Sequence, residues 1–233
     1  MLLSVIIPVF NGEKTIDRCL NSVEQQSIQT PLEVLVADDG STDGTAEILR
    51  THARACKYIK VLHLAHGGQA AARNAALKQA TGEWVCFLDA DDYWDADYLK
   101  HILPDLKEGI DVLQTGYRGF VCTRKYRFLS AWSKVIRRTF LEEHGIWFPE
   151  GMYYDDPVWA ARLWQAKPRI ALSASTDYNY TFNSQSVTAN PKPTKPVRKE
   201  LRRMGLRLWD FGWLRLRLAA HFIKDRWFIG YKI

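Results

Sequence analysis

Three carboxylates crowd the end of an apolar run in residues 85–92, VCFLDADD. Two carboxylates about 4 Å apart repel each other by about 4 kcal/mol at the effective dielectric of a protein cleft, so a cation or hydrogen-bond donors must offset the cost. If the backbone stays extended, Asp89 and Asp91 point to the same side, and the small Ala90 leaves the approach open. Mg²⁺ or Mn²⁺ takes such oxygen ligands together with substrate phosphate oxygens. The pair therefore predicts a divalent-metal site.

The neighbouring carboxylates have a simpler interpretation. Asp92 or Asp95 can cap a helix over residues 96–103, ADYLKHIL, because aspartate accepts hydrogen bonds from the free amides of a first helical turn. We expect capping for these two residues, and it remains an alternative for the Asp89/Asp91 pair.

A second carboxylate-rich loop follows an earlier apolar run, in residues 37–45, ADDGSTDGT. Asp39 is suited to accept a hydrogen bond from a nucleobase imide or a ribose hydroxyl. The alternative is structural: Asp39 and Gly40 form a turn, and Ser41 or Asp43 caps the next helix.

Two glycines precede an alanine-rich helix in residues 66–77, HGGQAAARNAAL. The glycines, Gly68 among them, let a ligand approach the backbone, and the alanines let the helix lie close to a sheet. Arg73 interrupts this small-residue segment. It is a candidate to reach a phosphate or a base, with a solvent-exposed surface position as the alternative.

The elements that must hold these loops alternate between strand and helix. Apolar β-branched runs at 3–10, 32–40, 59–65 and 83–92 alternate with helical periodicity at 13–26, 44–55 and 68–80. Repeated units of this kind predict a mostly parallel sheet with helices on both faces, and such sheets bind ligands beyond the carboxyl ends of their strands.

The pattern is looser after residue 110. We expect strands within 111–129, a helix over 137–145 that ends at Gly145, a helix over 153–166 and a strand within 170–182. Residues 190–196, NPKPTKP, carry three prolines and predict a linker. Trp132, Lys134, Trp147 and Tyr153 are candidates to line a cleft in this half.

Composition limits the class of protein. At 233 residues and 47% hydrophobic residues the chain can bury a large core, and general disorder is not expected. There is no apolar run of about 18 residues and no basic start before the N-terminal apolar run, so we expect neither a membrane-spanning helix nor a signal peptide. The four scattered cysteines suit reduced thiols in a cytoplasmic protein.

The net charge of +6 is unevenly distributed. Residues 195–233 hold eleven Lys and Arg against three acidic residues, a net of +8, which leaves −2 for residues 1–194. Apolar residues recur at helical spacing over 197–211 with basic residues on the other side, which predicts an amphipathic helix for an anionic membrane surface. The alternatives are a helix docked on the core with a solvated basic face and, less well supported because no recognised module accompanies it, nucleic-acid binding.

The four loops together resemble a family-2 glycosyltransferase of the GT-A fold. SVIIPVFN, EVLVADDGSTDGT, GGQAAARNAAL and GEWVCFLDADDYW stand in the order and spacing of that family, and the later AWSKVIRRTFLEEHGIWFPEGMYYDDPVWAARLW resembles its acceptor-side half. The resemblance covers roughly residues 3–190. It implies a GT-A domain over 1–190, with a nucleotide-sugar half (1–110) and an acceptor half (111–190), followed by a basic extension over 191–233.

The resemblance also implies roles for single residues. The donor-binding set comprises Pro8, Phe10, Asn11, Glu13, Asp39, Gly68, Arg73, Asp89, Ala90 and Asp91. Pro8, Phe10 and the turn after them flank the nucleobase. Asp39 binds the uracil, and Arg73 faces the base or the diphosphate. Asp89 and Asp91 correspond to the family's D-x-D pair, with Asp89 near the ribose and Asp91 on a Mn²⁺ or Mg²⁺ ion.

The acceptor half contributes Asp155 and Asp156, where the family usually has Glu-Asp. By position Asp156 is the general base, and the shorter Asp155 departs from the pattern, so its role is less defined. On the residues alone, either carboxylate can instead cap a helix that has Pro157 at its first position.

The activity implied by the resemblance is inverting transfer of a sugar from a nucleoside diphosphate, usually uridine, to a hydroxyl of a glycan or lipid-linked acceptor. The setting it implies is bacterial lipopolysaccharide, O-antigen or capsule synthesis at the inner face of the cell membrane, with the chain cytoplasmic, peripherally bound through residues 195–233 and without a nucleic-acid partner. Two other functions are compatible with strand-end carboxylates: a nucleotidyltransferase acting on a sugar phosphate, and a non-catalytic membrane-associated module that retains the fold.

Overall fold

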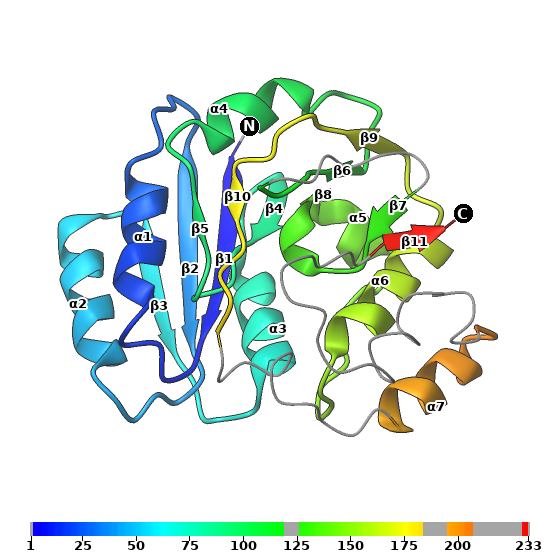
Figure 1. Cartoon of the computed structure of the whole chain (residues 1–233), viewed down its shortest axis with the longest axis horizontal. Coiled ribbons are helices and arrows are strands. Elements are labelled where there is room, and N and C mark those ends of the chain that lie inside the picture. Colours follow the sequence, from blue (N-terminus) through cyan, green and yellow to red (C-terminus); the bar gives the residue numbers. More distant parts are fainter. Residues whose placement is uncertain (1, 119–125, 184–194, 207–229, 233) are drawn as a thin grey trace.

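A central sheet of seven strands organises the molecule (Figure 1). The computed structural model describes residues 2–118, 126–183, 195–206 and 230–232. The strand order is β3-β2-β1-β4-β8-β6-β9. In chain order these strands are β1 (Leu3–Val9), β2 (Leu32–Asp38), β3 (Ile59–His63), β4 (Trp84–Phe87), β6 (Val112–Gln114), β8 (Lys134–Arg137) and β9 (Ile170–Leu172).

The sheet is mostly parallel, as expected. β1 pairs in parallel with β2 and β4, β2 with β3, and β6 with β9. The exception is β8, which runs antiparallel between β4 and β6 and which the sequence did not indicate as a strand. Because β8 is reversed, its first residues lie at the same sheet edge as the carboxyl ends of β1 to β4. This edge therefore gathers segments from both halves of the chain.

Helices cover both faces of the sheet (Figure 1). The α-helices are α1 (Ile16–Glu24), α2 (Thr45–Ala55), α3 (Gln69–Gln79), α4 (Tyr98–Ile102), α5 (Arg138–Glu143), α6 (Asp155–Gln165) and α7 (Lys195–Arg203), with short 3-10 turns η1 (Leu103–Asp105) and η2 (Ala131–Ser133). Two small antiparallel sheets complete the described elements. They pair β5 (Tyr93–Trp94) with β10 (Tyr178–Asn179), and β7 (Tyr126–Phe128) with β11 (Gly230–Lys232).

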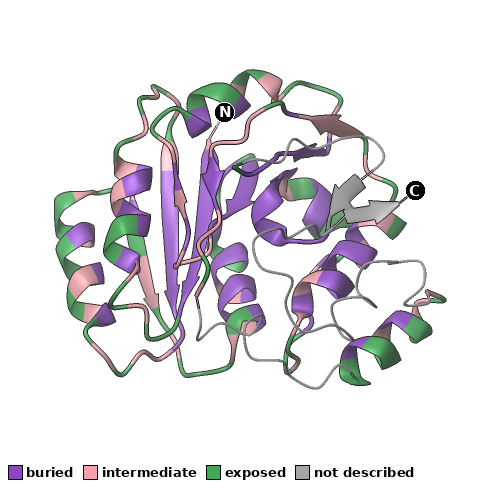
Figure 2. Ribbon diagram, viewed as in Figure 1, coloured by how far each residue is buried: buried purple, intermediate pink, exposed green. Residues whose placement is uncertain are grey.

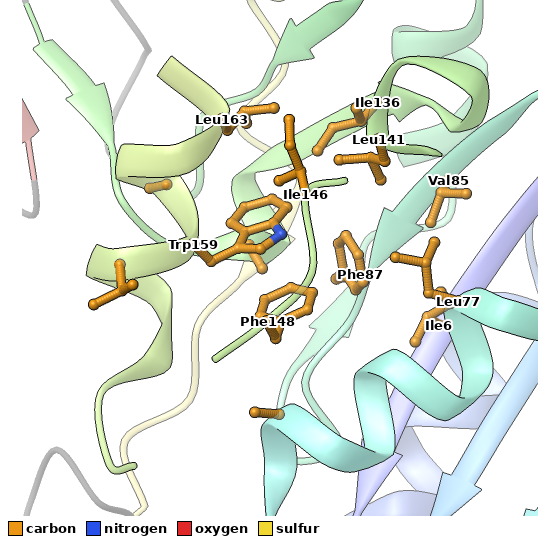
Figure 3. Packing of buried hydrophobic residues seen from close by; sticks show 14 of the residues in the cluster. Ile6, Leu77, Val85, Phe87, Ile136, Leu141, Ile146, Phe148, Trp159 and Leu163 are labelled. Atoms are coloured by element: carbon orange, nitrogen blue, oxygen red, sulfur yellow. The ribbon is translucent and has the colours of Figure 1, made fainter. Parts of the chain in front are cut away.

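Two hydrophobic clusters lie on opposite faces of the sheet. Val5 and Ile7 of β1 pack in the cluster of α1, α2 and α4, while Ile6 belongs to the cluster of α3, α5 and α6. In the second cluster Phe148 stacks on Trp159 at 4.6 Å between ring centroids, and Phe87 meets both rings edge-on (Figure 3). Figure 2 shows the inner strands buried throughout and the helices exposed on their outer sides. A strand buried on both faces reads as a continuous apolar run, which is why β1 was recognisable.

The helix ends are set by local chemistry. α5 ends as expected before Gly145, whose amide bonds Glu142 O at 3.1 Å, while the Ile146 amide bonds Leu141 O at 2.8 Å. α7 ends in the same way, because the Gly205 and Leu206 amides bond the carbonyls of Arg202 and Leu201 at 3.0 and 2.9 Å. Gly205 has φ +73°, a conformation that favours glycine at a helix end.

The prediction of a single helix over 197–211 is therefore wrong, because α7 ends at Arg203. The apolar side of α7 is also not available to a membrane, since Val197 and Leu201 are 2% and 1% exposed in the cluster of α3, α5 and α6. Glu200 adds an ion pair of 3.1 Å to Arg162 on α6. The alternative of a docked helix with an exposed basic face applies to α7, while residues 207–229 lie outside the described part of the chain.

Most of the linker expected at 190–196 also lies outside the described residues, and so does the domain boundary at 190/191. Its last two residues, Lys195 and Pro196, begin α7. Strands from 1–110 and from 111–190 share the central sheet. No helix among the described residues is both long and apolar enough to cross a bilayer.

Candidate active site

The carboxylates after β4 form a turn. β4 ends at Phe87, and the Asp92 amide donates to Asp89 O at 2.9 Å. The expectation of an extended backbone, which would place Asp89 and Asp91 side by side, is therefore wrong. At the end of this turn Asp92 is completely buried.

Neither Asp92 nor Asp95 caps a helix, which corrects the sequence interpretation. The Tyr178 hydroxyl donates to Asp92 Oδ2 at 2.6 Å, and the Thr181 amide donates to Asp92 Oδ1 at 2.7 Å. Burial, together with the charges of the two neighbouring aspartates, raises the pKa of Asp92. Asp95 accepts two bonds from the Arg118 guanidinium at 2.7 and 2.8 Å. Both side chains hold the β5–β10 region against the turn.

Arg73 is the centre of the site. It extends from the first turns of α3, is 1% exposed, and joins carboxylates that are 16 to 83 residues distant in sequence. Its Nη2 bonds Asp89 Oδ1 at 2.7 Å, and its Nη1 bonds Asp155 Oδ2 and Asp156 Oδ1, each at 3.0 Å. The guanidinium carbon also lies 5.1 Å from the centre of the Phe148 ring. The alternative that Arg73 is a solvent-exposed surface residue is therefore wrong.

One guanidinium serves three carboxylates, so this cluster would carry two excess negative charges if all three were ionised. Burial raises the pKa of Asp156 to about 7; Arg73 opposes that rise, and the charges of Asp155 and Asp89 add to it. Burial raises the pKa of Asp155 as well, against the influence of Arg73. The same three carboxylates raise the pKa of Arg73 further above its already high value, against its own burial. A carboxyl group with a pKa near 7 is suited to accept a proton at neutral pH.

Asp155 and Asp156 lie inside the first turn of α6. The residue before the helix is Tyr154, which has φ +60°, and no side chain caps this helix end. The expected capping by an aspartate with Pro157 at the first helical position is therefore wrong. Asp155 is buried and Asp156 is partly open, with 9% and 25% of their side chains exposed. Asp156 is thus the more accessible carboxylate of the two.

The loop after β1 is fastened to the loop after β2. Asn11 Oδ1 accepts the Thr42 amide at 2.8 Å, and Glu13 Oε2 accepts the Gly44 amide at 3.0 Å. Asp43 Oδ1 accepts the amide of Thr45, the first residue of α2, at 3.0 Å, but the N-cap of this helix is Gly44 and no side chain caps it, so the expected capping by Ser41 or Asp43 is wrong. Asn11 and Glu13 therefore join the two loops, and the donor contact expected for each of them remains a prediction.

Asp39 shapes the glycine loop. It is 3% exposed, and its two oxygens accept the amides of Gly67 and Gly68 at 2.7 and 2.9 Å. Gly68 has φ +91°, a backbone conformation that residues with a side chain disfavour. A glycine at position 68 therefore allows the amides of Gly67 and Gly68 to point toward the Asp39 carboxylate. His66 Nδ1 also lies 3.0 Å from Asp39 Oδ2, and the uracil contact predicted for Asp39 stays a prediction.

An exposed aromatic ring stands beside this loop. Phe10 follows β1, is 47% exposed, and stacks on His66 with 4.2 Å between ring centroids. Pro8 is buried within β1, and Ala90 lies in the turn between the two D-x-D aspartates. A flat base can stack on an exposed ring of this kind.

The chemistry of the D-x-D turn fits a divalent cation. Burial and the charge of Asp89 raise the pKa of Asp91, and the neutral Asn183 Nδ2 donates a hydrogen bond to Asp91 Oδ2 at 3.1 Å. A cation beside Asp91 would relieve this cost. The described residues hold no group of three or more His, Cys, Asp or Glu suited to a metal, so substrate oxygens would complete the shell. Asp91 and Asp89 are the residues that would hold it.

Several residues of the site were not found from the sequence. Tyr178 and Asn183 contact Asp92 and Asp91 across 86 and 92 residues, and Arg18 Nη2 donates to Asp91 O at 2.8 Å. No local motif marks any of the three. Lys134, a candidate for the cleft, is instead completely buried, with its Nζ bonded to Ser130 O at 2.7 Å.

The glycosyl transferase family 2 model matches residues 4–162, which include the loops after β1, β2, β3 and β4 and the start of α6. The chain belongs to glycosyl transferase family 2. Relatives include the uncharacterized glycosyltransferase YibD of Escherichia coli (strain K12), 28% identical over 80% of this chain and 63% of YibD. Another is the poly(ribitol-phosphate) beta-N-acetylglucosaminyltransferase TarS of Staphylococcus aureus (strain MW2), 31% identical over 77% of this chain. The chain spans only 35% of the length of TarS.

Solved structures agree on the architecture. S. aureus TarS 1–349 in complex with UDP-GlcNAc superposes with a TM-score of 0.74 at 28% identity, over 88% of this chain and 65% of that one. The mannosyltransferase PcManGT from Pyrobaculum calidifontis, in complex with GDP-Man and Mn²⁺, matches at 25% identity with a TM-score of 0.61, over 75% of this chain and 56% of that one. The family-2 chain therefore has the GT-A fold expected from its sequence, with a mostly parallel sheet flanked by helices.

Proposed function

We propose that this family-2 chain transfers a sugar, with inversion, from a nucleoside diphosphate to an acceptor hydroxyl. The observation that carries the proposal is the Arg73 cluster. It brings the D-x-D residue Asp89 and the acceptor-half carboxylate Asp156 onto one guanidinium, each within 3.0 Å of it. A donor bound at Asp89 and an acceptor bound at Asp156 would therefore lie next to each other. Group transfer requires this positioning.

The proposed chemistry follows from the two carboxylates. Asp156 takes the proton of the acceptor hydroxyl as that oxygen forms its bond to the anomeric carbon. The bond from this carbon to the donor phosphate oxygen breaks, and its electron pair leaves with the nucleoside diphosphate. Asp91 and Asp89 would hold a Mn²⁺ or Mg²⁺ ion, which supplies positive charge for the leaving diphosphate. Attack opposite the leaving group inverts the anomeric centre, so one base suffices.

The donor is proposed to be a uridine diphosphate sugar. The joined loops after β1 and β2, the exposed Phe10 and the buried Asp39 all lie at the carboxyl ends of the parallel strands, where such sheets bind ligands. The comparison with TarS bound to UDP-GlcNAc, at a TM-score of 0.74, supports this choice. The acceptor is proposed to be a bacterial cell-surface glycan of the lipopolysaccharide, O-antigen or capsule type.

The position proposed in the cell is peripheral, at the inner face of the membrane. The outer side of α7 supports it, because five exposed basic residues lie there: Lys195, Arg198, Lys199, Arg202 and Arg203. Each basic side chain near an anionic surface contributes about 1 kcal/mol. Replacing the five by Gln should weaken sedimentation with vesicles containing phosphatidylglycerol, and unchanged binding would exclude α7 as the contact.

The test of the activity is release of nucleoside diphosphate from UDP- and GDP-sugars with Mn²⁺, with and without EDTA. Asp156→Asn should lower transfer by about 10²–10⁴-fold and leave donor affinity nearly unchanged. Asp91→Asn should weaken donor and Mn²⁺ binding together. Asp97→Asn, at an exposed carboxylate that pairs with Lys100 at 3.3 Å, is the control and should change neither.

The outcomes separate the alternatives. Full turnover in the Asp156 variant would remove its role as base. Release of pyrophosphate from UTP would favour a nucleotidyltransferase. No turnover with any donor, together with vesicle binding, would favour a non-catalytic module.

A further inference from the structure

The side-chain amide of Asn74 is bonded to a distant stretch of backbone. Asn74 follows Arg73 on α3 and is 4% exposed. Its Oδ1 accepts the Phe148 amide at 2.9 Å, and its Nδ2 donates to Phe148 O at 3.0 Å and to Glu150 Oε1 at 2.8 Å. An asparagine amide offers donors and acceptors together, so it pairs with both backbone groups of one residue as a neighbouring strand would. In this way α3 holds residues 148–150 in place.

The segment that Asn74 holds leads to the carboxylates of α6. Residues 148–156 are attached to α3 at both ends, because Arg73 bonds the two aspartates at the start of α6. Between these ends the backbone has a positive φ twice, +73° at Gly151 and +60° at Tyr154. Two consecutive residues of one helix, Arg73 and Asn74, therefore set where this bent segment begins and where it ends.

The ring of Phe148 connects this segment to both parts of the Arg73 cluster. Its centre lies 5.1 Å from the guanidinium carbon of Arg73, and it stacks on Trp159 at 4.6 Å between ring centroids, with 4° between the ring planes (Figure 3). Trp159 lies on α6 three residues after Asp156, on the same side of the helix. A shift of Phe148 would therefore move the Arg73 cation and the helix that carries Asp156 relative to each other.

Packing alone does not fix the segment. An open cavity of about 520 Å³ lies beside it, and Asn74, Phe148 and Glu150 are among the residues that line this cavity. In the part of the chain that the structure describes, the amides of residues 150–152 bond no backbone carbonyl. A segment with a cavity on one side and few backbone bonds depends on side-chain bonds for its position. The bonds from Asn74 supply this support.

We infer that Asn74 is a positioning residue, which holds Phe148 and the segment before α6 so that Asp156 lies against the guanidinium of Arg73. The inference rests on the proposed transferase function, in which Asp156 is the base. The described residues that bond the Asn74 side chain all belong to the acceptor half, so its loss should leave the donor loops in place. A base misplaced by about 1 Å lowers a rate by about 10²-fold. Asn74 should therefore affect turnover and not donor binding.

The test compares turnover with donor binding in the full chain. Asn74→Ala removes all the bonds of this amide and should lower kcat by about 10²-fold, measured per folded protein well below the unfolding temperature. The affinity for UDP with Mn²⁺, measured by calorimetry, should stay nearly unchanged. Asn74→Ser keeps a polar group at the buried position and should lower kcat in the same direction where the alanine variant folds poorly. A general loss of stability would lower the folded fraction, which circular dichroism measures, and not the kcat of the folded molecules.

Glu33→Ala is the matched control, because it also removes buried side-chain bonds. Glu33 is 5% exposed, and its Oε1 accepts the Ser4 hydroxyl at 2.6 Å and the Thr81 hydroxyl at 2.9 Å, at the amino ends of β1 and β2. Its loss should lower stability and leave kcat unchanged. Hydrogen exchange followed by mass spectrometry gives a second readout, which needs no turnover. Asn74→Ala should speed exchange in α6 relative to α1, and Glu33→Ala should not.

The inference is overturned by any of three results: exchange in α6 that is no faster in Asn74→Ala, a kcat of the folded variant equal to that of the parent, or kcat and UDP affinity reduced by the same factor. A parent that turns over no donor, with faster exchange in α6 of Asn74→Ala, would refute the proposed function. In that case Asn74 would keep its role in holding the segment before α6 and the carboxylates that follow it.

Discussion

Replacement of Arg73 by Met tests the physical centre of the site. The change keeps a long side chain but removes the cation that Asp89, Asp155 and Asp156 share. Arg73 is 1% exposed, so water cannot replace its hydrogen bonds without opening the protein. Removing one partner of a buried ion pair costs about 3–5 kcal/mol, because the remaining charge is left uncompensated. We expect a loss of this size in the free energy of unfolding.

The loss should depend on pH. Without Arg73, Asp155 and Asp156 keep their burial and lose the cation that opposes its effect, so the native pKa values of these two carboxyl groups rise further. The native state then binds more protons than the unfolded state, and stability falls as pH increases. The deficit of the variant should be smallest near about pH 5 and largest near about pH 8.

Urea unfolding followed by tryptophan fluorescence measures both quantities. Arg50→Met is the matched control, because Arg50 and Glu47 form an ion pair with both side chains more than half exposed. Its cost should stay within about 0.5 kcal/mol at every pH. If the Arg73 variant were as stable as the Arg50 variant, or if its deficit did not grow with pH, the charge balance described for this site would be wrong.

Other consequences are equally direct. With the pKa of Asp156 raised to about 7, the turnover rate should increase with pH up to that value and then level off, and a rate independent of pH from about 5 to 9 would contradict its role as base. Gly68→Ala and Gly109→Ala both place a side chain on a residue with positive φ, and each should lower the free energy of unfolding by about 1–2 kcal/mol in thermal unfolding. Only Gly68→Ala should also weaken donor binding, measured by calorimetry. His52 contacts two carboxylates of α1 at 2.6 and 3.0 Å; its own burial lowers its pKa, but these contacts outweigh that and raise it. The stability it contributes is present below its unfolded pKa and lost as pH rises through the higher folded value, so His52→Gln should cost more at about pH 6 than at about pH 9 in thermal unfolding.

Much of the fold was predictable because it depends on local signals. The buried parallel strands are continuous apolar runs, and α1, α2 and α3 follow from helical periodicity, so their order in the sequence determined the first half of the sheet. β8 was missed because its four residues, KVIR, are too short and too basic to stand out. The length of α7 was overestimated, because the apolar spacing in the sequence continues past Gly205, whereas the helical backbone does not.

The sequence by itself determined which residues are predicted to carry the chemistry: the carboxylates after β2 and β4, the glycine loop and the pair at the start of α6. Only the tertiary structure decided how these residues are arranged. It turned Asp92 inward to Tyr178, gave the oxygens of Asp39 to two backbone amides, and placed Arg73 between the D-x-D turn and α6. The reason is physical: a charged side chain taken out of water must find its partner wherever the fold provides one, and no local spacing encodes a partner that lies more than eighty residues away.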